Sequence, residues 1–96
     1  MTKLNRHQTY AIEMIKEAFL DGFLGYENTL QDYPEDSEEY KMAYEVLHMG
    51  HEKLVEMIYG LVQVYAKNNA IERHINFAGK DFIKERISKR LEKYGY

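Results

Sequence analysis

The chain has 96 residues, of which 45% are hydrophobic and 30% charged, a balance typical of globular proteins and not of disordered ones. This length supports one hydrophobic core, so we expect a single domain over residues 1–96. The absence of cysteine excludes a disulfide framework, a thiolate metal site and a cysteine nucleophile. No apolar run has the length of a signal peptide or of a membrane span of about 20 residues, so we expect a soluble, cytoplasmic protein.

The net charge of −3 is distributed unevenly along the chain. Residues 1–79 carry seven basic and thirteen acidic side chains, a net charge of −6, whereas residues 80–96 carry six and three, a net charge of +3. Such asymmetry favours an acidic partner at the basic end or head-to-tail self-association, although inert solvated surfaces show it too.

The first predicted element is a long helix over about residues 5–30. Its apolar side chains recur at steps of three and four residues, with the 3.6-residue period of a straight α-helix. A coiled-coil seam would keep a period of 3.5 instead, so the pattern favours globular packing. The repeating side chains are Ile12, Ile15, Phe19, Phe23, Tyr26 and Leu30.

Small residues form a strip along one flank of this helix, from Ala18 through Gly22 to Gly25. Each helical glycine costs about 1 kcal/mol relative to alanine, so the strip predicts either a close helix contact or a kink near residues 21–25. Leu20 and Leu24 point to another, acidic arc, where a monomer would leave them exposed. We therefore expect a homo-oligomer, with a dimer favoured, in which helix 5–30 meets its symmetry mate through these residues.

A second long helix is predicted over about residues 37–67. Pro34, the only proline, lies in the polar connection before it. Ser37 is a suitable N-cap, and Glu38 and Glu39 suit the positive end of the helix dipole. Apolar residues then recur with the helical period as far as Tyr65. The two long helices are expected to form an antiparallel hairpin.

A shorter third helix is predicted over about residues 79–94. Ile83, Ile87 and Leu91 form its packing stripe. The fold class is therefore all-α: a hairpin of two long helices plus a C-terminal helix, in a three-helix unit that oligomerises. One flank of the third helix is a basic face with a single aromatic residue, composed of Phe82, Arg86, Lys89, Arg90 and Lys93.

This basic face has three interpretations: a nucleic-acid contact, an acidic protein partner or a plain solvated surface. It could lie along phosphates, but the remainder of the chain is acidic and shows neither helix-turn-helix spacing nor a base-stacking motif. An acidic protein is therefore favoured over nucleic acid, but a plain solvated face is favoured over both, because charge runs on helices usually face solvent.

The segment from Glu27 to Glu45 is a second candidate surface, with seven carboxylates and only one lysine. Tyrosine is enriched at interface hot spots, so tyrosines among acids indicate a surface for a basic partner. The negative charge expected at a helix start explains the same pattern. The predicted partner-binding residues are Tyr33, Glu35, Asp36, Glu38, Glu39 and Tyr40.

The residues Glu45, His48, His51 and Glu52 have spacings that metal-binding helical bundles use. However, His51 belongs to the apolar stripe while both glutamates lie about 100° away on the polar arc. A core histidine with local hydrogen bonds is the favoured interpretation, so we expect no metal and no cofactor. No serine lies in a pattern that indicates an activated nucleophile, so we expect no catalytic residue.

The leading functional hypothesis is a non-enzymatic protein-interaction module. In its size, tyrosine content and mild acidity the chain resembles the accessory or inhibitor proteins of phages and other mobile elements, which implies action by binding a partner protein. The alternatives are a nucleic-acid-binding dimer that uses the basic face and a metal-binding bundle that uses the histidines and carboxylates.

Overall fold

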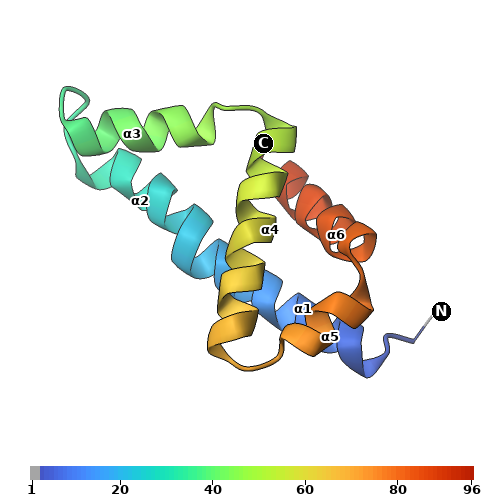
Figure 1. The fold of residues 1–96 in the computed structure, drawn as a ribbon. Helices are drawn as coiled ribbons and strands as arrows, with labels where there is room; N and C mark the ends of the chain where they lie inside the picture. The colour runs from blue at the N-terminus through green and yellow to red at the C-terminus, as the bar shows by residue number, and fades with distance from the viewer. Residues whose placement is uncertain (1–2) are drawn as a thin grey trace.

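The computed structural model describes residues 3–96, and these residues form helices and connections without a strand (Figure 1). The predicted all-α class is therefore confirmed. In chain order the elements are α1 (Arg6–Glu17), the π-helix η1 (Ala18–Phe23), α2 (Leu24–Asp32), α3 (Glu38–Leu47), α4 (His51–Asn68), α5 (Glu72–Ala78) and α6 (Lys80–Lys93).

The first long helix runs through α1, η1 and α2 without a break. It begins in a capping box, in which the Gln8 backbone N–H donates to the Asn5 side chain and the Asn5 N–H donates to the Gln8 side chain. In η1 the Leu24 N–H donates to the Phe19 carbonyl, so the helix widens where glycines predicted a possible kink. This π-segment buries Ala18, Phe19 and Phe23 together.

The predicted continuous helix over residues 37–67 is wrong, because α3 ends at Leu47 and α4 begins at His51. Gly50 permits the break, since its φ of 110° and ψ of 152° lie in a region that is essentially restricted to glycine. The hydrophobic period continues across the break and therefore conceals it. After Gly50, α4 turns away from α3 (Figure 1).

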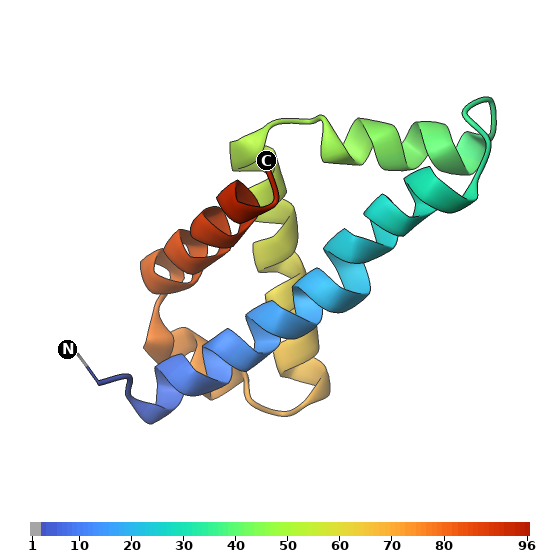
Figure 2. The same ribbon diagram turned by 180° about the vertical axis from the view of Figure 1, so that it is seen from behind.

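Of the predicted hairpin, the parts that lie side by side in antiparallel directions are α2 and α3, joined by residues 33–37 (Figures 1 and 2). The predicted hairpin of two full-length helices is not confirmed. We call the α2–α3 pair with its connection the arm. Ser37 caps α3 as predicted, since its side chain accepts a hydrogen bond from the Tyr40 backbone N–H at 3.2 Å.

Two further helices follow α4. The segment after residue 67 contains α5, which the sequence does not predict, and α6 nearly matches the helix predicted over residues 79–94. Gly79, with a φ of 95°, separates the two helices. The helix α6 packs against α4 and α1.

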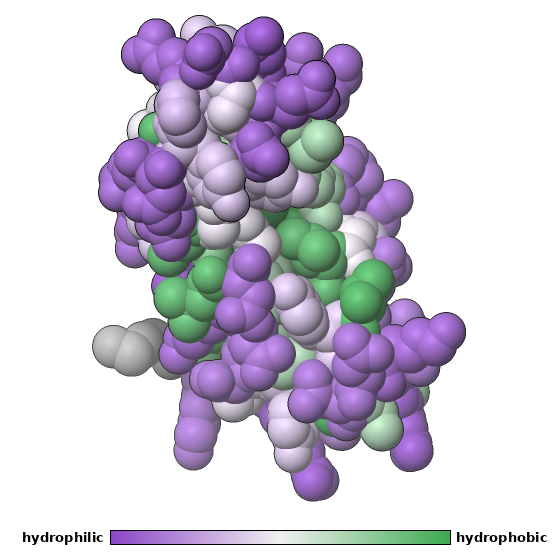
Figure 3. Space-filling view, turned by 90° about the vertical axis from the view of Figure 1, so that its left-hand side faces the viewer, coloured by the Kyte–Doolittle hydropathy of each residue, from purple (hydrophilic) through white to green (hydrophobic). Residues whose placement is uncertain are grey.

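The hydrophobic core lies where α1, η1, α4, α5 and α6 meet, and Leu47 joins it from the end of α3. The helix α2 has no buried residue, and the buried Ala43 of α3 lies outside the main cluster. The arm therefore projects from the core and lengthens the molecule, whose principal extents are 46 × 28 × 18 Å. Hydrophilic side chains cover the end of the arm (top of Figure 3).

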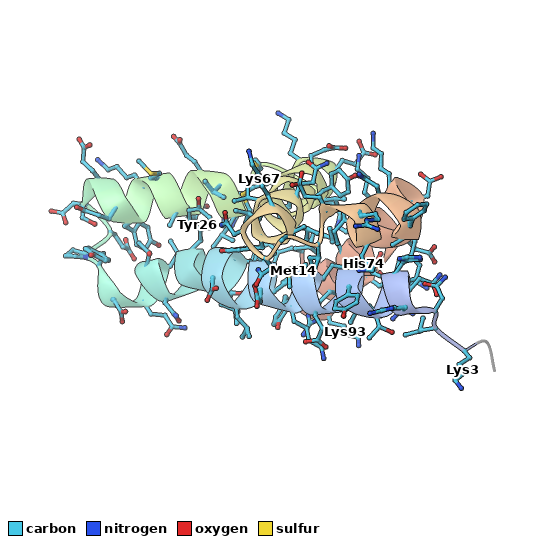
Figure 4. All side chains as sticks on the ribbon, turned by 60° about the horizontal axis from the view of Figure 1, so that its bottom comes forward. Lys3, Met14, Tyr26, Lys67, His74 and Lys93 are labelled. Atoms are coloured by element: carbon cyan, nitrogen blue, oxygen red, sulfur yellow. The ribbon has the colours of Figure 1, made fainter. Side chains whose placement is uncertain are left out.

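The helix α5 packs against the start of α1 through histidine and aromatic rings. The Nδ1 atoms of His7 and His74 are 2.8 Å apart, so one imidazole donates a hydrogen bond and the other accepts it. His74 also stacks on Tyr10 with 4.4 Å between ring centroids, and it lies beside α1 in Figure 4. Burial of this contact lowers the pKa of His74, and the positive charges of His7, Arg6 and Arg73 lower it further.

We expect the protein to lose stability as the pH falls through this titration. The folded-state pKa of His74 lies below the ordinary value of about 6.5, so the unfolded chain binds the proton first. The contribution is complete above about pH 6.5 and is lost as the pH falls through the folded-state pKa. Thermal melting between about pH 8 and pH 5.5 measures it. His74→Phe should flatten the profile, whereas the same change at the exposed His48 should not; equal profiles for both variants would contradict this account.

Candidate functional site: a basic groove between α1 and α6

A groove of about 760 Å³ lies between α1 and α6. Its apolar floor comes from Ile12 and Ile15 of α1, with Phe82 of α6 and Tyr94 just beyond α6. All five residues of the predicted basic face line it, together with Glu85. The structure thus brings the predicted face into one concave site, and it adds an α1 wall that the sequence did not predict.

The helical period of α6 positions these side chains. Ile83, Ile87 and Leu91 are fully buried and fix the orientation of α6 on the core. Because residues three and four apart share a helix face, the neighbouring flank presents its cations along one line. The basic face is therefore held on a rigid, packed helix.

Two arginines lie over aromatic rings at the groove. The Arg86 guanidinium is 5.2 Å from the centroid of the Phe82 ring, and that of Arg90 is 5.3 Å from the centroid of the Phe19 ring. Cation–π attraction holds both charges against apolar surface.

The groove keeps an excess of positive charge. Lys89 pairs with Glu85 at 3.0 Å, but both side chains are exposed and such pairs contribute little. Within residues 3–96 no carboxylate lies within 4.0 Å of Arg86, Arg90 or Lys93. An apolar floor beneath cations suits a ligand that is both acidic and amphipathic.

The predicted acidic surface lies at the end of the arm. Tyr33, Glu35, Asp36, Glu38, Glu39 and Tyr40 occupy the connection and the first turn of α3. None of these carboxylates forms an ion pair with another described residue. The ring of Tyr44 stacks on that of Tyr40, with 6.3 Å between centroids, and on that of His48, with 4.0 Å, and neither contact was predicted. Spacing of four residues along α3 is the signal that could have revealed this aromatic ladder.

The predicted self-association strip is largely used within the chain. Ala18 is fully buried, and a Cβ atom on Gly22 would come within 2.5 Å of Leu61 Cδ1 of α4. The close helix contact of Ala18 and Gly22 is therefore with the remainder of the same chain, and their predicted role in self-association is not confirmed. Leu24 packs partly buried against the core, Gly25 faces open space, and Leu20 is 64% exposed.

The histidines of the metal hypothesis have other partners. The His48 Nδ1 lies 2.9 Å from the Tyr44 carbonyl oxygen, and Glu45 and Glu52 are exposed. Nowhere within residues 3–96 do three or more His, Cys, Asp or Glu residues gather so that they could hold an ion. The predicted quartet is therefore not assembled into one site.

His51 instead joins the start of α4 to α6. Its Nδ1–H donates to the Tyr96 backbone oxygen at 2.9 Å, and its Nε2 accepts the Ser88 hydroxyl hydrogen at 2.6 Å. This contact was not predictable from the helical period, because the break at Gly50 determines where His51 points.

The order of groups in this network, a serine hydroxyl, a histidine and an oxygen acceptor, is also that of activated serine nucleophiles. However, Ser88 lies inside α6, where neighbouring N–H groups bond within the helix and cannot stabilise an oxyanion. We therefore interpret the network as a packing contact.

Comparisons with family models, with curated proteins and with solved structures return no match for this chain. Within the described part of the chain, no helix has the length and apolar character needed to cross a membrane. The geometry and charge of the groove are therefore the basis on which a function can be proposed.

Proposed function

We propose that this chain is a cytoplasmic, non-enzymatic protein-interaction module whose α1–α6 groove binds an acidic, amphipathic segment of a partner protein. The single observation that supports this most is the line of four cations above a floor of Ile12, Ile15, Phe82 and Tyr94. Binding to this segment would inhibit the partner protein or recruit it, which is how a small phage-like accessory or inhibitor protein would act.

The groove offers two complementary sources of binding energy. Apolar side chains of the partner would cover the floor at about 25 cal/mol per Å² of buried apolar area. Carboxylates of the partner would lie near the cations, which adds specificity and speeds association. Nucleic acid uses only the second source, and the net charge of −6 on residues 1–79 repels it.

The binding test uses a helical peptide of glutamate and leucine with its leucines on one face. We expect the peptide to bind the wild-type chain more tightly than a DNA duplex does at the same salt concentration. The triple variant Arg86→Glu/Arg90→Glu/Lys93→Glu should weaken peptide binding at least about tenfold, since three ion pairs are replaced by repulsion. Fluorescence anisotropy of the labelled peptide measures the affinity.

A matched control reverses three lysines outside the groove, Lys3→Glu/Lys53→Glu/Lys67→Glu, and changes the net charge equally. This variant should keep most of the peptide affinity, and circular dichroism should show the same helix content for both variants. An equal loss of peptide affinity in both variants would mean that net charge alone determines binding, and it would refute a groove site. Tighter binding of DNA than of peptide would favour the nucleic-acid alternative.

A further inference from the structure

The arm and the groove are complementary in charge and in chemistry. Residues 27–45 carry seven carboxylates and one lysine, whereas the groove is lined by four cations and one carboxylate. The arm also exposes apolar surface on α3, where Met42 is 65% and Tyr44 48% exposed. It therefore has the two properties that the groove selects, negative charge and apolar side chains.

The exposed rings of the arm suit a cationic groove. Tyr40, Tyr44 and His48 stack in succession along α3, so they present a preordered aromatic surface with little side-chain entropy left to lose. Arginines bind tyrosine faces and carboxylates at once. The guanidinium groups of Arg86 and Arg90 already lie against aromatic rings, which shows that the groove holds cations next to such surfaces.

The arm cannot fill the groove of its own chain. In both Figure 1 and Figure 2 the arm points away from α6, and the core helices α4 and η1 lie between them. The arm is also fixed in direction, because α2 continues directly from η1 without a hinge. Any arm that occupies the groove must belong to another molecule.

We propose that the arm of one copy of this chain docks into the α1–α6 groove of a second copy. The inference rests on the proposed function, because it uses the same groove and names one occupant for it. Each copy offers one arm and one groove, so two copies can exchange arms reciprocally as a closed dimer or continue as an open chain. This contact replaces the strip around Gly22 as the self-association surface, and an acidic partner would compete with it.

A charge-swap experiment tests the docking. The arm variant is Glu35→Lys/Glu38→Lys/Glu39→Lys, and the groove variant is the Arg86→Glu/Arg90→Glu/Lys93→Glu triple described above. Sedimentation of the wild-type chain at low salt should give a mass that rises with concentration above 11.5 kDa, and salt should reverse this rise. Each variant alone should sediment as a monomer at every concentration.

Mixing the two variants should restore association, because the acidic arm of the groove variant then meets the basic groove of the arm variant. The acidic groove likewise meets the basic arm, so both contacts of a reciprocal dimer are recovered. A control that reverses Glu52, Glu72 and Glu92 to lysine changes the net charge as much as the arm variant does but leaves both surfaces intact, so it should still self-associate as the wild type does. Circular dichroism establishes that every variant is folded.

The outcomes separate this inference from the proposed function. A wild-type chain that stays monomeric at low salt, or variants that do not associate on mixing, would overturn arm docking. If the groove still binds the glutamate–leucine peptide in that case, the proposed function stands without self-association. If neither the peptide nor the arm depends on the groove cations, both proposals fail.

Discussion

Replacing Phe23 with alanine is expected to lower the free energy of unfolding by about 3–5 kcal/mol, the usual cost of truncating a buried phenylalanine. Phe23 is fully buried in η1, and its ring centroid lies 5.5 Å from that of Tyr94 and 5.2 Å from that of Tyr96. The substitution removes these aromatic contacts and leaves a cavity beside Phe19. The total free energy of unfolding of a native domain is about 5–15 kcal/mol, so this variant would lose a large part of its stability.

Urea denaturation followed by circular dichroism measures this change. The matched control is Leu20→Ala, in the same π-segment but with 64% of Leu20 exposed. It should stay within about 0.5 kcal/mol of the wild type. Similar losses of stability in both variants would mean that η1 does not bury Phe23 in preference to Leu20. If Leu20→Ala instead weakened a dimer, this would support the prediction that Leu20 takes part in self-association.

Replacing Gly50 with alanine is expected to cost about 1–3 kcal/mol, because alanine is strained at a φ of 110° and a ψ of 152°. Space is not the reason, since nothing lies within 4 Å of a Cβ placed on Gly50. Gly60 provides a control of opposite sign. It lies inside α4 with equally open space, so Gly60→Ala should stabilise the protein by about 0.5–1 kcal/mol.

Thermal and urea unfolding of the two glycine variants test the break between α3 and α4. Opposite signs are the expected result, because of the two glycines Gly50 and Gly60 only Gly50 has a positive φ. If Gly50→Ala stabilised the protein as much as Gly60→Ala, residues 37–67 would form the single helix that the hydrophobic period predicts.

Local signals predicted much of the fold. The polar residues around Pro34 and the cap at Ser37 gave the start of α3, and the packing stripe from Ile83 to Leu91 gave α6 and its orientation. The break at Gly50 was not predictable in this way, because the 3.6-residue period is the same on both sides of it. The sequence pattern does not determine the φ and ψ of a glycine within it, because tertiary contacts select them.

The candidate site likewise has a part that was predictable from the sequence and a part that was not. The basic face follows from the period of one helix, so its five residues were predicted together. The floor supplied by Ile12 and Ile15 depends on how α1 and α6 pack, which no spacing within either helix encodes. The contact between His51 and Ser88 depends on the direction of α4 after the break. Properties of one helix were therefore predictable, and contacts between helices were not.

Nuclear magnetic resonance mapping of the glutamate–leucine peptide tests the central claim most directly, because it locates the binding surface residue by residue. We predict that titration shifts the methyl signals of Ile12 and Ile15 and the amide signals of Phe82 to Tyr94. The amides of residues 33–40 at the end of the arm should stay unchanged when the protein is dilute enough to be monomeric, so that no docked arm is displaced. Shifts that avoid α6, or that spread evenly over the surface without saturation, would contradict the assignment of the groove as the binding site.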